Sequence, residues 1–530
     1  MSSFVQAQIS KSEFGKKEEL AYRRYIQALA SDEFLGRKPF TLGETRTIAY
    51  LEEQFKELGL QPGNGDSYFQ KVPMVEIKGH FQGEEVRVDG KNGKLTLRAL
   101  TDIVGGTRQL VKEKKTLQAP LVFIGFGIDA PEYHWNDYAG VDVKGKIIVV
   151  LINDPGFYNP QLFRGKDMTY YGRWTYKFEE AARKGAAGVL IIHDTKPAAY
   201  DWSVVRSSWS KSKLYLQADN DNQEFCGLEG WISGTSAQEL FKLSGRNDFA
   251  SLLEQAKKPG FKAVPLSATL SCTIENEWKK STSTNVAALL PGTTRADEYI
   301  VYSAHWDHFG VGEPILGDSI YNGAADNASG TAGLLSLAKK FKESARNQRS
   351  VLFLAVTGEE AGLLGSEYYV LHPLFPLKKT VIDINMDVLQ PFGKMKDIFL
   401  IGKGQSDADA YLEAAARKQN RTVRAVPDAS NGWYYRSDHF SFAKAGVPAI
   451  YIEGGIQSLA HGESWGQAQQ EEYVKSRYHK PQDEYSPSWD VSGTMADLEL
   501  IFDAGRKLAN ISVFPVWKDG MYKKIRENQK

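Results

Sequence analysis

The chain has 530 residues, enough at roughly 150 residues per domain for two to four domains or one large domain with insertions. Its 65 Lys and Arg residues balance 65 Asp and Glu residues, so the composition gives no sign of a nucleic-acid or acidic-lipid partner. Every apolar run is far shorter than the roughly 20 residues of a membrane span, so we expect none.

The first predicted elements are two helices within residues 18–60, where apolar residues recur at helical spacing on either side of a loop at 31–37. Residues 119–268 differ in character. They contain a β-α-β unit and several Gly-rich turns, but no group of metal ligands. The only cysteines, Cys226 and Cys272, are too few for a disulfide framework or a thiolate zinc site, and a single bridge between them stays open.

From about residue 281 onward, short apolar strands alternate with helices. This alternation predicts an α/β fold, with a mainly parallel sheet covered by helices on both faces. The predicted strands are 286–290, 299–303, 350–356, 380–386 and 449–452, and the predicted helices are 330–341, 362–371, 408–419 and 498–508.

Five candidate metal ligands lie in this half of the chain. They are two imidazoles and three carboxylates: His305, Asp326, Glu360, Asp387 and His479. Three of them follow predicted strands directly, and the carboxyl ends of strands are where sites form in open α/β sheets. Two divalent cations can be held by this set if one carboxylate bridges them, and such a pair of metals is suited to hydrolysis. Alone, each segment has an ordinary reading, such as a helix cap at Asp326.

Two further acids adjoin the candidate ligands. Glu359 precedes Glu360 after a buried strand, and adjacent side chains there point in different directions. One carboxylate can therefore bind metal while the other faces a bound water. Asp307, two residues after His305, is expected to accept the second ring N–H of that histidine and so to set its tautomer.

Several motifs carry a family resemblance. SAHWDH (303–308), GAADNASG (323–330), TGEEAGLLGSEYY (357–369), INMD (384–387) and RYHKPQDEY (477–485) resemble the di-zinc metallopeptidase family that includes bacterial leucyl aminopeptidases and glutamate carboxypeptidase II. The resemblance implies two Zn²⁺ ions per chain, for which Co²⁺ or Mn²⁺ could substitute. It also implies a role for each matched residue: His305 and Asp387 on one zinc, Glu360 and His479 on the other, Asp326 as the bridge, Glu359 as general base, Tyr478 as oxyanion stabiliser and Asp307 behind the ligands.

The domain organisation follows from the same resemblance. The segment RWTYKFEEAARKGAAGVLII (173–192) resembles the protease-associated domain that is often inserted in this family. We therefore expect a peptidase domain formed by residues 17–115 and 275–530, interrupted by a smaller β-rich insertion at 116–274. Because such insertions accompany extracytoplasmic relatives, and because Val5-Gln6-Ala7 is weakly similar to a signal cleavage site, we expect a periplasmic or secreted protein.

The predicted function is that of a zinc-dependent exopeptidase, most consistent with an aminopeptidase that releases N-terminal residues from peptides. Three alternatives remain at this stage. A glutaminyl cyclase would use a single zinc, and a carboxypeptidase would need cations such as Arg436 to bind a free carboxylate. A receptor-like module would have lost catalysis, against which the intact ligand set argues. The sequence predicts neither the oligomeric state nor the residue preferred at the cleaved position, although 432–436 and 454–465 are candidate pocket loops.

Overall fold

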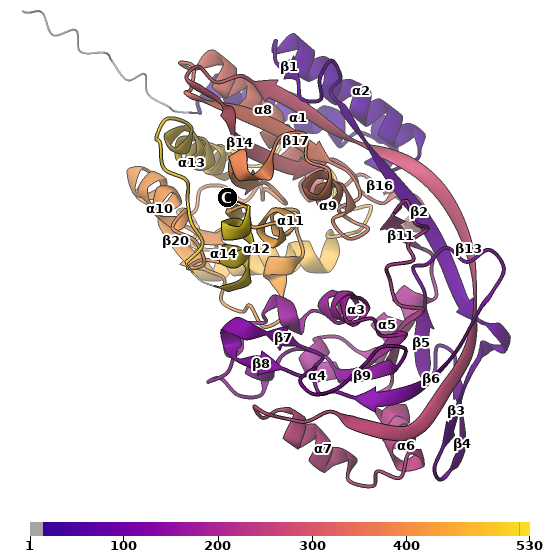
Figure 1. Cartoon of the computed structure of the whole chain (residues 1–530). Helices are drawn as coiled ribbons and strands as arrows, with labels where there is room; N and C mark the ends of the chain where they lie inside the picture. The colour runs from indigo at the N-terminus through magenta and orange to yellow at the C-terminus, as the bar shows by residue number, and fades with distance from the viewer. Residues whose placement is uncertain (1–13, 519, 530) are drawn as a thin grey trace, which may run out of the picture. The chain divides into compact units, whose positions relative to one another are not determined.

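A computed structural model of the chain describes residues 14–518 and 520–529, so the weak cleavage-site match at 5–7 lies outside the described residues. The chain forms two compact units (Figure 1). The first contains Met1–Val72, Thr282–Val426 and Ser437–Lys530, and the second contains Pro73–Ser281 and Pro427–Arg436.

The sheet of the first unit has a parallel centre and antiparallel flanks. Strands β17, β14, β18 and β21 are parallel neighbours in this order. The end of β13 lies antiparallel beside β17, and β19 lies antiparallel beside β21 and parallel to β20. The strands are β1 (Gln61–Pro62), β13 (Val264–Leu290), β14 (Arg295–His305), β17 (Arg349–Val356), β18 (Thr380–Asn385), β19 (Asp397–Leu400), β20 (Thr422–Ala425) and β21 (Ala449–Gly454), with a separate hairpin of β15 (Gly310–Ile315) and β16 (Asp318–Tyr321).

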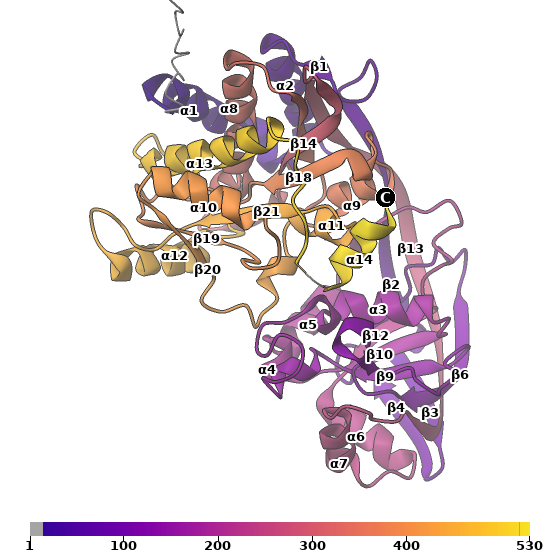
Figure 2. The ribbon, with the colours of Figure 1, turned by 60° about the vertical axis from the view of Figure 1, so that its left-hand side comes forward.

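Helices cover both faces of this sheet because its central strands are apolar on both sides. In β17, Phe353 packs in the core shared with α1, α2, α8, α10 and α13, whereas Leu352 and Leu354 pack on the opposite face with α9 and α11. Figure 2 shows α13 and α10 as neighbours. The predicted α/β fold is therefore confirmed. The helices are α1 (Lys16–Leu29), α2 (Leu42–Glu57), α8 (Ser329–Glu343), α9 (Leu364–Leu371), α10 (Asp409–Lys418), α11 (His439–Lys444), α12 (Glu463–Ser476), α13 (Ser492–Ala509) and α14 (Gly520–Asn528).

The second unit has its own core around the parallel strands β6, β9, β10 and β12, and the predicted β-α-β unit is β9-α3-β10. Cys226 and Cys272 are buried free thiols here. The strands are β2 (Phe69–Phe81), β3 (Glu85–Gly90), β4 (Gly93–Arg98), β5 (Ile103–Gly106), β6 (Lys115–Phe123), β7 (Asp129–Ala130), β8 (Trp135–Asn136), β9 (Ile147–Leu151), β10 (Gly188–Ile192), β11 (Lys213–Leu216) and β12 (Leu228–Ile232), and the helices are α3 (Trp174–Arg183), α4 (Thr195–Ala198), α5 (Trp202–Trp209), α6 (Gly234–Leu243) and α7 (Phe249–Ala256).

The boundaries between the units differ from those expected at 115/116 and 274/275. The units change at 72/73 and 281/282, inside strands β2 and β13, which both continue across the change. A boundary inside a continuous strand has no linker composition by which the sequence could reveal it. The short segment 427–436 also belongs to the second unit, where the Tyr435 hydroxyl donates to the Met168 carbonyl (3.1 Å). Among the helices that the structure describes, none has the length and apolar character needed to cross a membrane.

Candidate metal centre

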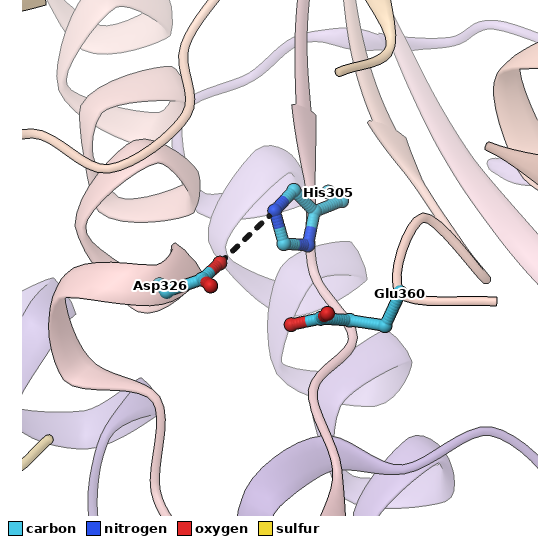
Figure 3. A group of neighbouring side chains, drawn as sticks. All are labelled: His305, Asp326 and Glu360. Atoms are coloured by element: carbon cyan, nitrogen blue, oxygen red, sulfur yellow. Dashed lines mark ion pairs between the residues drawn. The ribbon is translucent and has the colours of Figure 1, made fainter. Parts of the chain in front are cut away.

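The five predicted ligands meet at the carboxyl edge of the parallel strands. His305 is the last residue of β14, Glu360 follows β17, and Asp387 lies two residues beyond the end of β18. Asp326 lies in a short turn before α8, and His479 lies in the loop after α12. Figure 3 shows the side chains of His305, Asp326 and Glu360 directed toward one another from three separate segments.

Asp326 stands between two histidines. Its Oδ1 lies 3.3 Å from Nε2 of His305, and its Oδ2 lies 3.2 Å from Nε2 of His479. His305 Nε2 is also 3.1 Å from Oδ1 of Asp387, and His479 Nε2 is 3.4 Å from Oε2 of Glu360. The arrangement thus consists of two histidine–carboxylate pairs on either side of one carboxylate, which is the grouping that the family resemblance implies; whether it binds two metal ions stays a prediction.

Glu359 lies on the side of the first pair. Its Oε2 is 4.0 Å from His305 Nε2, and ligand atoms of His305, Glu359 and Asp387 lie within 4.8 Å of one another. Atoms of His305, Asp326 and Glu360 form a second such group. The Glu359 carboxylate therefore faces the centre, near enough to act on a molecule held there. Its role as base and not ligand remains a prediction.

The pKa values of these carboxylates are shifted by burial and by their charged neighbours, and a bound cation would relieve the repulsion among them. Burial raises the pKa of Glu359 and Glu360 well above its usual range, and the neighbouring carboxylates Asp387 and Asp326 raise it further. For Asp326 burial acts in the same direction, but hydrogen bonds from His305 and His479 lower its pKa overall. Carboxylates that repel one another in a buried site, together with two imidazoles, match the ligand chemistry of paired divalent ions such as Zn²⁺.

His308 supports one of the ligands. Its Nδ1 lies 2.6 Å from Oε1 of Glu360, and burial lowers its pKa to about 3, which keeps the ring neutral. The neutral ring can donate from Nδ1, so it holds Oε1 while Oε2 turns toward His479. The sequence analysis did not assign this role, although His308 ends the quoted motif SAHWDH.

Asp307 contacts the site through atoms other than those expected. Nδ1 of His305 lies 3.1 Å from the Asp307 carbonyl oxygen but 3.9 Å from its carboxylate. The carboxylate instead accepts the backbone N–H of Glu359 at 3.2 Å. The chain turns after β14 so that the main-chain carbonyl reaches the ring, and Asp307 joins the histidine loop to the glutamate loop.

Two more side chains hold ligands in place. The buried carboxylate of Asp483 accepts the backbone N–H groups of Ala325 (3.1 Å) and Asp326 (3.0 Å). The hydroxyl of Ser437 donates to Oδ2 of Asp387 at 2.7 Å. Neither was predicted, since their partners are a backbone segment and a residue on a distant loop. The only sequence signal was the position of Asp483 inside the motif RYHKPQDEY.

Arg37 belongs to the loop predicted at 31–37, and its side chain is fully buried. Its Nε donates to the Trp306 carbonyl (2.8 Å) and its Nη2 to the Gly323 carbonyl (2.8 Å). Its Nη1 donates to the carbonyls of Asn322 (2.6 Å) and Leu29 (2.7 Å). The guanidinium therefore joins the end of α1 to the loops that carry His305 and Asp326.

Tyr478 and Arg436 complete the predicted residues. The Tyr478 ring stacks on His479, with centroids 3.7 Å apart, so its hydroxyl is carried by the same loop as the ligand. Arg436, the candidate carboxylate binder, belongs to the second unit and donates to the Asn431 carbonyl at 2.9 Å.

Comparison with known proteins identifies the part of the chain that contains these ligands. Residues 285–502 match the model of Peptidase family M28. This part of the chain is therefore similar to peptidase family M28, and we call residues 285–502 the M28 region. All five predicted ligands, Glu359 and Tyr478 lie inside the M28 region, whereas Arg37 lies outside it.

Relatives with a similar sequence carry different names. Aminopeptidase YwaD of Bacillus subtilis (strain 168) is 27% identical over 375 residues, which are 70% of this chain and 63% of the relative. A glutamate carboxypeptidase 2 homolog of Caenorhabditis briggsae is 26% identical over 389 residues, 64% of this chain and 46% of the relative. Aminopeptidase NAALADL1 of Mus musculus is 31% identical over 139 residues, 24% of this chain and 17% of the relative. The chain spans less than two thirds of each of these relatives.

Solved structures similar to this one include an aminopeptidase from Aneurinibacillus sp. strain AM-1. It has a TM-score of 0.46 and 19% identity, and the match covers 93% of this chain and 95% of that one. A zinc aminopeptidase from Bacillus subtilis has a TM-score of 0.43 and 18% identity, with 95% and 98% covered.

Proposed function

We propose that this protein is a peptidase of family M28 and that it acts as a zinc-dependent aminopeptidase that binds two Zn²⁺ ions. His305 and Asp387 would hold one ion, Glu360 and His479 the other, and Asp326 would bridge them. The observation that carries the proposal is the position of Asp326, whose two carboxylate oxygens lie 3.3 and 3.2 Å from two different imidazoles. A one-metal site has no use for a carboxylate shared in this way.

The protein's own residues supply the remaining chemistry. When bound, the two ions would lower the pKa of a water molecule from about 15.7 toward 7 and polarise the scissile carbonyl. Glu359, beside His305, would accept the proton of the attacking water and pass it to the leaving amine. The hydroxyl of Tyr478 would donate a hydrogen bond to the oxyanion that develops on the carbonyl. His308, Ser437 and Asp483 would hold the ligands in place during this reaction.

Two observations support exopeptidase action on free N-termini. Relatives of the M28 region include proteins named aminopeptidases, among them YwaD of Bacillus subtilis. In addition, the centre gathers the carboxylates of Asp326, Glu359, Glu360 and Asp387, and a cationic α-ammonium group is attracted to such surroundings.

The test compares peptides that differ only at their ends, using zinc-loaded enzyme and an EDTA-treated sample. We expect release of the first residue from peptides with a free amine, no cleavage of the same peptides after N-acetylation, and loss of activity in EDTA. Metal analysis at saturation should give two zinc ions per chain. Cleavage of acetylated peptides at the carboxyl end would replace the proposal with a carboxypeptidase. One zinc per chain with pyroglutamate as product would replace it with a glutaminyl cyclase.

We also propose that the protein acts outside the cytoplasm, on the grounds of the weak cleavage-site match and the resemblance of residues 173–192 to an insertion of extracytoplasmic relatives. Fractionation of producing cells tests this: recovery of the active protein in the cytosol with residues 1–7 retained would contradict it.

A further inference from the structure

A cavity of the first unit is lined by Arg477, which lies two residues before the candidate ligand His479, and this cavity has no part in the chemistry described so far. Its volume is about 510 Å³, within the roughly 300–1,000 Å³ typical of ligand pockets. The loop after β18, the loop after β21, helix α12 and the segment before α13 form its walls, which include the aromatic side chains of Phe392, Trp465 and Trp489. Two of these walls follow the carboxyl ends of parallel strands, the edge that also carries the ligands.

The charges in this cavity are unequal. Lys394, His461 and Arg477 line it, against one carboxylate, that of Asp490. The Oδ1 atom of Asp490 already accepts the backbone N–H of Ser492 at 3.0 Å. Within residues 14–518 and 520–529, neither Lys394 nor Arg477 forms a side-chain hydrogen bond or an ion pair. The hydrogen-bond donors of these two cations are therefore not used by protein acceptors, although the charge of Arg477 already interacts with the buried carboxylate of Asp483.

Arg477 connects this cavity with the catalytic loop. It lies two residues before His479 and directly before Tyr478, and its guanidinium carbon lies 5.4 Å from the ring centroid of Tyr473. Two residues of extended chain span at most about 7 Å, so the backbone of Arg477 lies within that distance of the backbone of His479. A planar guanidinium can bind a carboxylate through two parallel hydrogen bonds.

We propose that this cavity is a subsite for the free C-terminal carboxylate of short peptide substrates, with Arg477 as the group that binds it. The proposal rests on the aminopeptidase function proposed above. The substrate's amino end would lie at the metal centre, its chain would run past Tyr478, and its carboxylate would meet Arg477 and Lys394. Trp465 and Trp489 would cover the side chain of the last residue.

A subsite for the C-terminal carboxylate would make cleavage depend on the length of the peptide. An extended peptide advances about 3.3 Å per residue, so only a narrow range of peptide lengths can place the amino end at the metal centre and the carboxylate at Arg477. The enzyme is therefore expected to favour short peptides within that range over long chains. In longer substrates the carboxylate lies beyond the cavity, and Arg477 then contributes little.

The experiment uses the zinc-loaded full chain and pairs of tri-, tetra- and pentapeptides that end either in a free carboxylate or in an amide. We expect kcat/KM to be about 10- to 100-fold higher for the acid than for the amide at the best length, since a hydrogen-bonded charge pair contributes about 1.5–3 kcal/mol. In Arg477→Gln this ratio should fall toward one, and Arg477→Lys should restore part of it.

Lys475→Gln is the matched control. Lys475 is an exposed residue of the same segment that does not line the cavity, and its replacement removes the same charge. It should leave the acid-to-amide ratio unchanged. If wild-type enzyme cleaves acid and amide peptides equally, or if Lys475→Gln lowers the ratio as much as Arg477→Gln, the subsite is refuted while the aminopeptidase function stands. If no peptide with a free amine is cleaved, the function itself fails.

Discussion

Replacement of Arg37 by Met tests whether the metal centre depends on a residue outside the M28 match. The change removes four hydrogen bonds from the guanidinium to main-chain carbonyls. At about 1.5–2 kcal/mol for each bond from a charged donor, the loss amounts to roughly 6–8 kcal/mol. Burial of the charged guanidinium offsets part of the stabilisation that these hydrogen bonds give, and it lowers the pKa of Arg37 to about 10. That lowering corresponds to roughly 3 kcal/mol.

The net expectation for Arg37→Met is a loss of roughly 3–5 kcal/mol from the free energy of unfolding of the first unit, together with weaker zinc binding. At about 2 °C per kcal/mol for a unit of this size, the melting temperature should fall by roughly 6–10 °C. The assay is urea unfolding followed by tryptophan fluorescence, with zinc content measured on the same samples. Because the Arg37 bonds tie the loops of His305 and Asp326 to α1, metal loss should precede global unfolding.

Arg346→Met provides the comparison. Arg346 is an exposed arginine of the same unit whose Nη2 donates to one carbonyl, that of Pro291 (3.2 Å). Its replacement should change stability by no more than about 0.5 kcal/mol. If Arg37→Met unfolded within about 1 kcal/mol of wild type and kept its full zinc content, Arg37 would not support the centre and the estimate would be wrong.

Three further outcomes are expected. Glu359→Gln should keep two zinc ions while kcat falls roughly 10²- to 10⁴-fold, and wild-type turnover at normal zinc content would assign the base to another group. Asp326→Asn has one oxygen in place of two, so it should bind at most one zinc tightly; two tightly bound ions, measured by competition with a chelator, would exclude the bridge. Burial lowers the pKa of Lys213, which lies over the Trp209 ring, to about 7. The unfolded chain therefore binds more protons between about pH 7 and 10, and the second unit should gain stability as pH rises through that window. Lys213→Met should be more stable at pH 7 and lack this gain in urea unfolding at pH 7 and 9, and an unchanged pH dependence would contradict the assignment.

The ligands could be predicted because three of them follow apolar strands and all share a recognisable chemistry. His305 ends one strand and Asp387 lies two residues beyond another, and the buried apolar residues of both strands are visible in the sequence. Residues such as Arg37 could not be predicted, because their partners are backbone carbonyls brought close only by the fold. Helix α12 was missed for another reason: only two of its residues, Gly466 and Tyr473, are buried, so it has no apolar period.

The length of β13 was equally hidden. Its polar middle, which includes Lys279 and Lys280, lacks the alternation of a half-buried strand, although the strand runs without a break from Val264 to Leu290. Strand periodicity reports burial, and an exposed stretch of strand gives no such signal. Because the exposed middle of β13 shows no strand pattern, we expected a domain boundary at 274/275, where the strand in fact continues.

The strands that leave and re-enter the catalytic unit are direct neighbours. The backbone N–H of Ala287 donates to the Tyr68 carbonyl at 2.7 Å, and the Lys71 ammonium donates to the Thr284 hydroxyl at 3.2 Å. The points at which the chain leaves and re-enters this unit thus lie on paired strands, which are about 4.8 Å apart. A two-residue Asn-Gly turn in place of residues 73–281, with the 427–436 loop shortened, is the natural starting design for a miniature peptidase.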